Sequence, residues 1–594
     1  MRPLVKLLAF IRPYWRRAAL ALILLSTLVL FDLAIPRLVQ RIIDQGINAH
    51  NQQVVIQTSL VMLALSVVGA LIAIGNNQFS IQVGEGVARD VREAIFLKIH
   101  SLSYGDLDRR GTGELMVRLT SDTNAFKQLV QITLRIGTRA PMLMLGSLIL
   151  MFRTSPSLAA SLLPLLAVTL LAIVSFIGKT EPMFRTVQRR LDRLNTVLQE
   201  NVAGVRLVRS FARAEFEEGR FEDANEAYTL NSARVMRLMA VMGPTLTMLV
   251  NIGMVIVIYA GGRQAIAGTM TEGQIVAFVN YLLTTMTPLI MMTMLSNVWA
   301  SGMASATRID DVLATHPQVA DAPDAVAVPP DLPGRIVFQD VSFRYREDGG
   351  EPVLRDVNLV VDPGETVAIL GATGSGKLTL VNLVPRFYDA TAGRVLIDGL
   401  DVRRLRQEDL LAHIGIVPQE ALLFSGTVAD NIRYGDPRAG DEAVTAAAGA
   451  AQAAEFVEAR PEGYAAPVEP RGANFSGGQK QRLTIARALL PDPRILILDD
   501  STSSVDVETE THIQEALEAQ PHHRTTLVVA QRISTVLNAD KIVVLDHGKI
   551  VAQGTHRELM QSSPVYREIY DSQLGDGNHL MPGPAAPGVA EAAS

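Results

Sequence analysis

Six long apolar runs in the first half of the 594-residue chain constrain its fold more than any other feature. A helix needs about 20 mainly apolar residues to cross the ~30 Å hydrocarbon core of a bilayer. One such run could be a buried helix of a soluble protein, but six in succession predict a domain of six membrane-spanning helices. The runs lie near 18–35, 54–74, 137–152, 157–177, 239–259 and 274–299. The third is short and carries Arg139 close to its start, so we expect that helix to begin earlier, toward Ile132.

The distribution of lysine and arginine orients this domain, because cytoplasmic loops of membrane proteins carry an excess of both. Segments 1–17, 78–135 and 178–238 contain 5, 8 and 11 of them, and segments 36–53, 153–156 and 260–270 contain 2, 1 and 1. Both termini are therefore predicted to lie in the cytoplasm, with the chain in the inner or plasma membrane.

Two of the basic segments, 78–135 and 178–238, are too long and too periodic to be simple loops. We expect the membrane helices to continue through them into the cytoplasm. Each segment has room for a short coupling helix that touches a cytoplasmic domain, near 121–127 in the first and near 211–217 in the second.

Two features inside the spans are candidates for function. Asp32 lies within the first run, and ionisable residues inside a membrane are costly and usually functional. The alternative is that Asp32 lies near the outer interface, close to Pro36, and faces water or another helix. The fifth and sixth runs are rich in methionine, whose flexible thioether suits a promiscuous apolar cavity and equally suits ordinary packing.

Composition excludes several other classes of protein. The net charge of −6 argues against nucleic acid as a partner. The chain has no cysteine, which excludes disulfides and thiolate metal sites.

The second half of the chain has a different pattern. Residues 315–334 contain five prolines and indicate an extended linker after a membrane domain of residues 1–314. In residues 335–574 short β-branched strands alternate with helices, which predicts an α/β domain with a largely parallel sheet. Residues 575–594 are rich in Ala, Gly and Pro and are predicted to be disordered.

A glycine-rich loop follows the first buried strand of this α/β domain, Val367–Leu370. Its glycines let the backbone wrap around phosphates, and Lys377 supplies a charge to them. The next residue should be Ser or Thr, to bind Mg²⁺, but Leu378 has no oxygen. Thr379 has a hydroxyl, but it leaves the helix in a direction that differs by about 100°. The loop reads Gly371, Ala372, Thr373, Gly374, Ser375, Gly376, Lys377.

A second buried strand, Ile495–Leu498, runs into two carboxylates. Asp499 is placed to hold the metal ion, and the residue after it should polarise the attacking water. That residue is Asp500, which is one methylene shorter than glutamate. Loss of good general-base geometry typically costs ~10²–10⁴-fold in rate.

In their order and spacing these motifs resemble those of ATP-binding cassette transporters that fuse six transmembrane helices to one nucleotide-binding domain. The resemblance covers about residues 5–574. It implies a multidomain membrane protein with an all-α six-helix transmembrane domain and an α/β P-loop ATPase domain that uses ATP and Mg²⁺. It also implies that Tyr345 stacks on adenine, that Gln419 contacts Mg²⁺, and that Gln531 occupies the position of a switch histidine.

The segment Phe475–Gln479 matches the signature motif of this family, with Phe in place of the usual first Leu. The motif residues expected to act on ATP are Ser476, Gly477, Gly478 and Gln479. Asp506 matches the segment that crosses between two cassettes. Pro470 stands where the family usually has glutamate in its cross-talk segment.

In the family, two cassettes dimerise head to tail, and each ATP lies between the phosphate loop of one and the signature of the other. The resemblance therefore implies that this chain weakens its own site at Leu378, Asp500 and Gln531, yet supplies an intact signature to a partner's site. This pattern resembles that of the degenerate-site subunit of bacterial heterodimeric multidrug exporters. Its partner would be a second half-transporter with a competent glutamate and histidine.

Two other readings stay open: a slow homodimeric exporter with Asp500 as a weak base, and a non-catalytic regulatory subunit. A broad cavity with few charges favours hydrophobic or amphipathic substrates such as drugs, lipids or peptides.

Overall fold

The computed structural model describes residues 6–345, 350–500, 507–518 and 524–574. The chain divides into two compact units, one of Met1–His100 with Thr112–Thr315 and one of Ser101–Gly111 with His316–Ser594. The tail predicted to be disordered, 575–594, lies outside the described residues.

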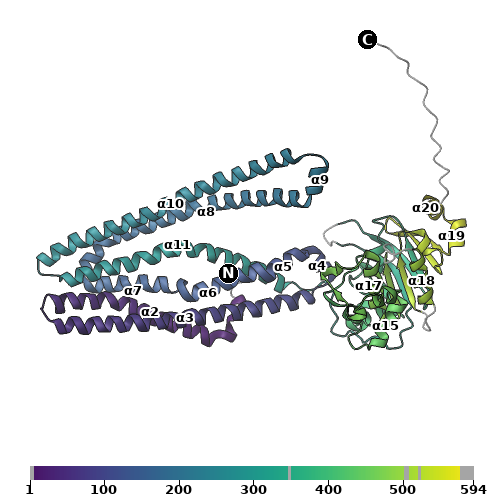
Figure 1. The fold of residues 1–594 in the computed structure, drawn as a ribbon, viewed down its shortest axis with the longest axis horizontal. Coiled ribbons are helices and arrows are strands. Elements are labelled where there is room, and N and C mark those ends of the chain that lie inside the picture. The colour runs from purple at the N-terminus through teal and green to yellow at the C-terminus, as the bar shows by residue number, and fades with distance from the viewer. Residues whose placement is uncertain (1–5, 346–349, 501–506, 519–523, 575–594) are drawn as a thin grey trace, which may run out of the picture. The chain divides into compact units, whose positions relative to one another are not determined.

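The first unit is all helix, and its long helices lie side by side (Figure 1). Five helical segments are long and apolar enough to span a membrane: Lys6–Ile47, Gln52–His100, Thr112–Thr154, Pro156–Ala203 and Ala214–Ile266. The sixth predicted span, 274–299, lies within the 43-residue helix α11. The predicted fold class, a helical transmembrane domain followed by an α/β domain, is confirmed.

The helices of this unit have the following bounds: η1 Ala9–Tyr14, α2 Trp15–Arg41, η2 Ile42–Ile47, α3 Gln52–His100, α5 Thr112–Val117, η3 Arg118–Asp122, α6 Thr123–Ile132, η4 Thr133–Gly137, α7 Arg139–Thr154, α8 Pro156–Ala203, α9 Val205–Ser210, α10 Ala214–Ile266 and α11 Glu272–Ala314. The helix that carries the third apolar run begins well before Ile132, as expected, because helical structure continues from Thr112 to Thr154. Two π-helical turns, η3 and η4, interrupt its regular geometry.

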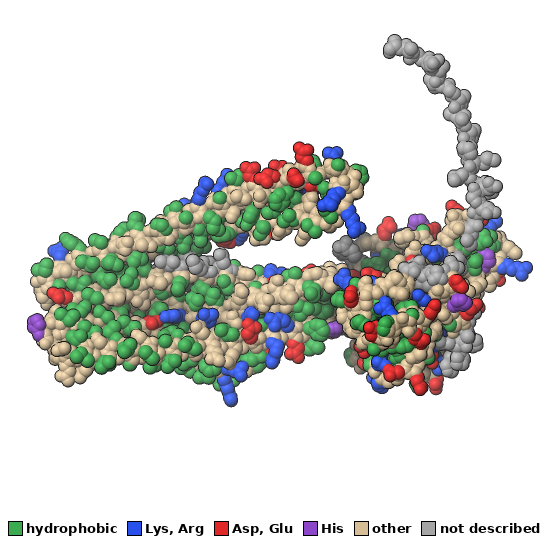
Figure 2. Space-filling view, viewed as in Figure 1, with side chains coloured by type: hydrophobic (Ala, Val, Ile, Leu, Met, Phe, Trp, Pro, Cys, Tyr) green, Lys and Arg blue, Asp and Glu red, His purple; other side chains and the backbone are tan. Residues whose placement is uncertain are grey.

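Apolar side chains cover much of the face of this unit that Figure 2 shows. Leu60, Leu63 and Leu71 of α3 are 59%, 62% and 64% exposed, and Leu171 of α8 is 69% exposed. Contiguous apolar surface of this extent on a monomer marks contact with a membrane or a partner. The long helices satisfy their own backbone hydrogen bonds, so this surface fits lipid hydrocarbon.

One short helix from the N-terminal half of the chain, α4 Tyr104–Arg110, belongs to the second unit. The prediction of a short coupling helix near 121–127 is therefore wrong, because those residues belong to the first unit. Ser103 and Asp106 form a capping box at the start of α4, and Gly111 with φ +68° follows its end. Residues 121–127 carry no such signals. They lie in η3 and α6, which pack against α11 and α3.

Aromatic contacts hold α4 in the second unit. The ring of Tyr104 stacks on Phe387 with centroids 3.9 Å apart. The hydroxyl of Tyr388 donates a hydrogen bond to Asp108. Burial and this carboxylate together raise the pKa of Tyr388, so its hydroxyl remains a donor across the physiological range.

The second predicted coupling helix, 211–217, overlaps the observed turn and begins just after the observed short helix. The short helix is α9, Val205–Ser210, which follows Gly204. The chain then turns at Phe211 and Ala212, where Ala212 has φ +49°, and α10 begins at Ala214. Leu207 and Phe211 at this tip are 63% and 70% exposed.

The second unit contains two main sheets. The larger one has the order β12-β11-β3-β10-β9-β6, in which all pairs are parallel except β11 with β12, so the prediction of a largely parallel sheet is confirmed. Its strands are β3 Thr366–Leu370, β6 Ile414–Val417, β9 Ile495–Asp499, β10 Thr525–Val529, β11 Lys541–Asp546 and β12 Lys549–Gly554. The smaller sheet is antiparallel, with β1 Ile336–Phe343, β2 Leu354–Val361, β4 Ala392–Ile397 and β5 Leu400–Asp401.

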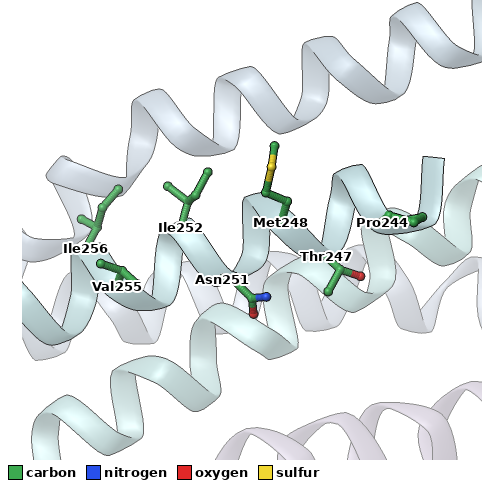
Figure 3. Close-up of a pocket in the computed structure, with 7 residues that line it drawn as sticks. All are labelled: Pro244, Thr247, Met248, Asn251, Ile252, Val255 and Ile256. Carbon is green, nitrogen blue, oxygen red and sulfur yellow. The ribbon is translucent and has the colours of Figure 1, made fainter. Parts of the chain in front are cut away.

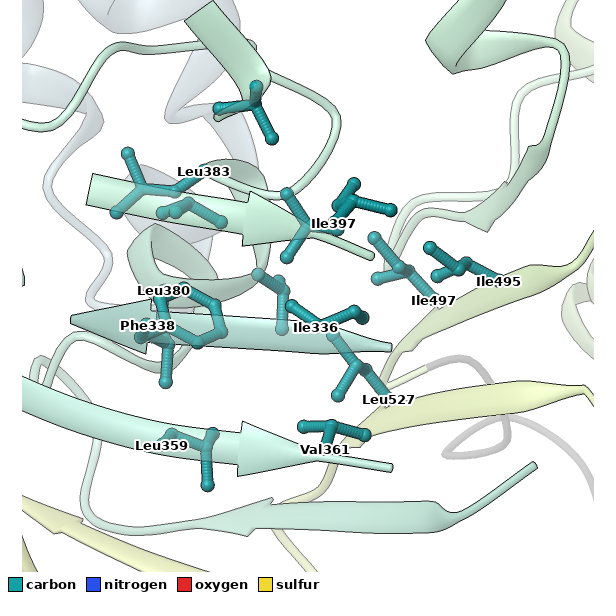
Figure 4. Close-up of a cluster of buried hydrophobic side chains, with 14 of the residues drawn as sticks. Ile336, Phe338, Leu359, Val361, Leu380, Leu383, Ile397, Ile495, Ile497 and Leu527 are labelled. Atoms are coloured by element: carbon teal, nitrogen blue, oxygen red, sulfur yellow. The ribbon is translucent and has the colours of Figure 1, made fainter. Parts of the chain in front are cut away.

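A hydrophobic core joins these two sheets (Figure 4). Ile336 and Phe338 of β1 pack with Leu380, Ile497 and Leu527 in one cluster of buried side chains. Val328 and Leu332 of the proline-rich segment are buried in the same cluster. The segment between the units is therefore extended but packed onto the second unit.

The described helices of the second unit, besides α4, surround the sheets. They are α12 Lys377–Asn382, η5 Val402–Arg404, α13 Gln407–Leu411, α14 Val428–Arg433, α15 Asp441–Ala450, α16 Ala454–Glu458, η6 Gly463–Ala465, η7 Pro470–Gly472, α17 Gly477–Leu489, α18 Val507–Glu518, η8 Ile533–Val536, α19 His556–Ser562 and α20 Pro564–Leu574. A small two-stranded antiparallel sheet, β7 Gly426–Thr427 with β8 Pro467–Val468, lies beside α14.

Candidate functional site

Four neighbouring strands bring the predicted site residues to one edge of the larger sheet. Val529 of β10 lies opposite both Ile369 of β3 and Asp499 of β9, and β6 is parallel to β9. The carboxyl ends of these strands therefore share an edge, which is where open α/β sheets bind ligands. The segments that leave this edge carry the loop 371–377, Gln419, Asp499, Asp500 and Gln531.

The glycine-rich loop has the backbone geometry that its glycines predict. Gly374 and Gly376 have φ of +85° and +103°, a region that glycine enters without steric cost. A Cβ on Gly376 would lie 2.9 Å from Leu354 Cδ2, so this position also has no room for a side chain. Thr373 is exposed at the tip of the loop, whereas Ser375 Oγ is buried and has no hydrogen-bond partner within the described part of the chain.

Lys377 lies inside this loop. Its Nζ donates hydrogen bonds to the carbonyl oxygens of Gly371, at 2.6 Å, and Ala372, at 3.0 Å. Burial lowers the pKa of Lys377, and the carboxylates of Asp500 and Asp499 oppose the shift. The ammonium group is thus held where a phosphate bound in the loop would meet it.

The two residues after Lys377 differ in their surroundings. Leu378 is 46% exposed. Thr379 is buried, and its hydroxyl forms a 2.8 Å hydrogen bond with the hydroxyl of Tyr345. That bond directs the Thr379 hydroxyl toward Tyr345, which disfavours it as a replacement for the one that Leu378 lacks.

Tyr345 is fixed on a small aromatic cluster. Its ring meets Phe343 and Tyr388 edge to face, with centroids 4.9 Å and 5.3 Å away. The ring remains 43% exposed, which leaves surface for a flat ligand to stack on.

Gln419 links the two carboxylates at the end of β9. Its backbone amide donates to Asp499, and its Nε2 lies 3.3 Å from Asp500 Oδ2. Burial raises the pKa of Asp499, and the neighbouring Asp500 raises it further. Burial also raises the pKa of Asp500, against the opposing charge of Arg532 and the hydrogen bond from Gln419.

These residues fit a Mg²⁺ ion only in part. Amide and carboxylate oxygens, as in Gln419 and Asp499, are the ligands that Mg²⁺ prefers. No described group of three or more His, Cys, Asp or Glu side chains could hold a metal by itself. Mg²⁺ would therefore depend on these two residues, phosphate oxygens and water, because Leu378 offers no oxygen.

Gln531 follows β10, and its side chain is exposed. Its backbone is held by Gln573, a residue that no motif in the sequence singles out. Gln573, on α20, donates from Nε2 to the carbonyl oxygen of Gln531 at 2.9 Å and accepts at Oε1 from the amide of Ile533 at 2.8 Å. One side chain therefore clamps both sides of this loop. A glutamine 42 residues downstream gives no local signal of such a contact.

The signature segment forms the start of α17. Ser476 and Gln479 make a capping box, in which Ser476 Oγ accepts from the Gln479 amide at 3.3 Å and Gln479 Oε1 accepts from the Ser476 amide at 3.0 Å. Ser476 and Gly477 are exposed. The helix start, with its partial positive charge, is therefore open to an anion from outside this chain.

Phe475, in place of leucine, has a packing role. Its ring lies under the guanidinium of Arg460, 4.0 Å from the ring centroid. Arg460 also donates to the carbonyl oxygen of Asn474 at 3.3 Å. Asn474 in turn donates to the carbonyl of Pro467, so the signature is tied to the segment that contains Pro470. Asp506 lies outside the described residues.

Asp32 of α2 faces another helix, α7, which is one of the positions considered for it. Its Oδ2 lies 2.8 Å from Nη2 of Arg139, and both side chains are partly buried. The methionines divide between packing and open surface: Met242 and Met286 are buried, and Met248 is exposed.

Comparison with known proteins agrees with both units. Residues 18–289 match the family model described as the ABC transporter transmembrane region, and residues 354–503 match the ABC transporter model. The chain is 37% identical over 570 residues to an uncharacterised ABC transporter ATP-binding protein of Bacillus subtilis, covering 96% of this chain and 98% of that one.

Two further matches are a relative whose name gives its substrate and an exporter whose structure has been solved. An ATP-dependent lipid A-core flippase of Syntrophus aciditrophicus is 36% identical over 492 residues, covering 83% of this chain and 81% of the flippase. The structure of a bacterial Atm1-family ABC exporter with ATP bound has a TM-score of 0.78 and 28% identity, covering 94% of this chain and 99% of that chain.

Proposed function

The chain belongs to the ABC transporter family and is an ATP-driven exporter, and we propose that it acts as the degenerate-site half of a heterodimer. In this proposal the chain binds ATP at its own phosphate loop, hydrolyses it slowly, and supplies its signature to the competent site of a partner half-transporter. The termini and the nucleotide-binding unit lie in the cytoplasm, and the helical unit spans the cell membrane.

One contrast carries the proposal. The signature is fully formed, since Ser476 and Gln479 cap α17 reciprocally. The chain's own site lacks the hydroxyl at Leu378, and the nearby Thr379 is engaged by Tyr345. Departures in the phosphate-loop half-site beside a well-formed signature half-site fit a pair of subunits in which only one of the two ATP sites hydrolyses quickly.

ATP would act mainly through binding. A nucleotide held between Lys377 of this chain and the partner's signature favours the closed arrangement by its higher affinity for that state. Hydrolysis at the site that Ser476 completes would then reset the pair. Mg²⁺, when bound, neutralises charge on the phosphates.

A test uses two variants of this chain in the purified complex. Lys377→Ala damages only the site proposed to be slow, so steady-state ATP turnover should fall little. Ser476→Arg blocks the partner's site and should abolish turnover. Equal, near-complete losses in both variants would contradict the proposal, as would robust turnover by the wild-type chain alone.

A slow homodimer is the second candidate, and the environment of Asp500 favours it. This carboxylate is partly buried and faces Gln419, which is an environment suited to a general base. The homodimer predicts that Asp500→Asn in the chain alone abolishes its slow turnover. Substrate transport by a reconstituted complex that stops on ATP depletion would argue against a non-catalytic regulatory subunit.

Relatives support a lipid-like substrate. The flippase relative acts on lipid A-core, and we propose amphipathic or hydrophobic molecules as substrates of this chain.

Orientation can be tested directly because the chain has no cysteine to remove. A single cysteine in place of His50 should react with a membrane-impermeant maleimide in intact cells, and one in place of His547 should react only after lysis. The opposite pattern would contradict the proposed orientation.

A further inference from the structure

A hollow of about 570 Å³ lies between four helices of the membrane unit. Its lining comes from α2, α3, the η4–α7 segment and α11. The wall is mainly apolar, with Leu25, Leu28, Leu143, Leu283 and Met291 among its side chains. Three charged residues also line it: Asp32, Arg135 and Arg139.

The hollow is lined by more positive than negative side chains. Arg139 pairs with Asp32 through one hydrogen bond of 2.8 Å from its Nη2. Arg135 makes no ion pair or hydrogen bond within the described part of the chain, and its Nε is buried without a partner. The hollow therefore holds two guanidinium groups and one carboxylate, which leaves one net positive charge.

Unused donors concentrate on the same two arginines. Arg139 Nε is also buried and unpartnered among the described residues, although its Nη2 is engaged. A guanidinium offers five N–H donors in a planar fork that matches a carboxylate or a phosphate. The other polar groups there are mostly occupied, since Asn76 donates to the carbonyl of Ala21 and Asn280 to that of Val276.

These arginines lie at the start of the third predicted span, near 137–152, on its predicted cytoplasmic side. Arg139 precedes Thr154, the last residue of α7, by 15 residues, which places it roughly 22 Å along the helix from that end, and Arg135 lies about one turn further. Charged residues that line a hollow of a membrane domain are costly unless they are paired, and they mark substrate or ion pathways. A structural role would favour a neutral pair, which Asp32 and Arg139 already form without Arg135.

We propose that this hollow binds the anionic head of an amphipathic substrate, with the oxygens of a carboxylate or phosphate taking up the free donors of Arg135 and Arg139. The apolar tail packs against the leucines and Met291 of the wall. This inference rests on the proposed export function and gives its substrate class.

A second hollow gives a contrast. It has a volume of about 650 Å³ along one face of α10 and is lined by Pro244, Thr247, Met248, Asn251, Ile252, Val255 and Ile256 (Figure 3). No charged side chain lines it, so it has no means of selecting an anion. Binding there would not respond to changes at Arg135.

Binding of four dodecyl probes that differ only in the head group tests the proposal. The full chain in phosphatidylcholine nanodiscs, without nucleotide, is titrated with dodecyl phosphate, dodecanoate, dodecanol and dodecyltrimethylammonium, with empty nanodiscs as background. We expect both anions to bind at least tenfold more tightly than the neutral and cationic probes. Equal affinity of dodecanol or dodecyltrimethylammonium would overturn the proposal.

Variants of the hollow sharpen the test. Arg135→Gln should weaken dodecyl phosphate binding about tenfold, or ~1.4 kcal/mol, and leave dodecanol unchanged. Arg135→Lys keeps the charge and should retain most of the affinity, and Asp32→Asn should increase it. Arg37→Gln, on an exposed arginine of α2 that bonds Gln40, is the matched control and should have no effect. Unchanged dodecyl phosphate binding in Arg135→Gln would overturn the proposal.

Phosphatidic acid in the nanodisc separates two sources of the anion. Competition with dodecyl phosphate would support a membrane lipid as the ligand. Binding without competition would support a free anionic amphiphile. The measurement needs no ATP, so a chain that binds anions but shows no ATP-driven transport would refute the export proposal and not this one.

Discussion

The clamp that Gln573 forms on the loop after β10 makes a quantitative prediction. Gln573→Leu removes the hydrogen bonds to the Gln531 carbonyl and from the Ile533 amide. Each is worth about 0.5–1.5 kcal/mol, and the lower end applies because both glutamines are exposed. The two together contribute about 1 kcal/mol, which corresponds to a roughly fivefold change in the population of the open loop.

Hydrogen–deuterium exchange of the intact protein measures this directly. The Ile533 amide should exchange roughly fivefold faster in Gln573→Leu, because it loses its acceptor. Gln573→Glu separates the two bonds, since a carboxylate can still accept from Ile533 but cannot donate to Gln531. Ile533 should therefore stay protected in that variant.

Gln561→Leu changes an exposed glutamine on the neighbouring helix α19 and serves as the control. Unchanged exchange at Ile533 in Gln573→Leu would refute the clamp. Equally fast exchange in Gln573→Leu and Gln573→Glu would refute the assignment of the accepting oxygen.

Three more outcomes follow from the site and from α4. Leu378→Ser with Asp500→Glu should raise the ATPase rate of the chain by about 10²-fold or more, because it restores a metal ligand and the reach of the base; an unchanged rate would show that other positions limit turnover. Ser476→Ala removes the cap of α17 and should destabilise that helix by about 0.5–2 kcal/mol, seen as faster amide exchange in its first turn, whereas unchanged exchange would contradict the capping role. Tyr388→Phe removes the hydrogen bond to Asp108 and should speed amide exchange in α4, because that bond helps to hold the helix on the second unit. Unchanged exchange in α4 would show that the bond is dispensable.

The sequence was sufficient for the parts of the site that local chemistry determines. The loop 371–377 needed only its glycines and lysine, and Asp499 needed only its place at the end of a buried strand. Parallel strands then bring such residues to one edge without further information. The roles assigned to these residues in binding and hydrolysis stay predictions.

The sequence was misleading about where the helices break. Ser103, Asp106 and Gly111 carry the capping box and the helix stop that define α4, so a search for these signals would have found it. The segment 121–127 lies in the same long basic stretch but has no capping box and no glycine stop. The clamp by Gln573 and the ion pair between Asp32 and Arg139 could not be predicted, because each joins distant helices through single side chains.

The assignment of α4 to the second unit has a consequence for how the protein can be divided. The chain passes between the two units three times, at His100–Ser101, at Gly111–Thr112 and at Thr315–His316. Proteolysis of the proline-rich segment would cut the covalent link to residues 316–594, and the two fragments would then be held together by the packing of α4 on Phe387 and Tyr388. A shortened polypeptide that begins at His316 lacks the eleven-residue segment Ser101–Gly111 and would expose the aromatic face of Phe387 and Tyr388 that α4 covers.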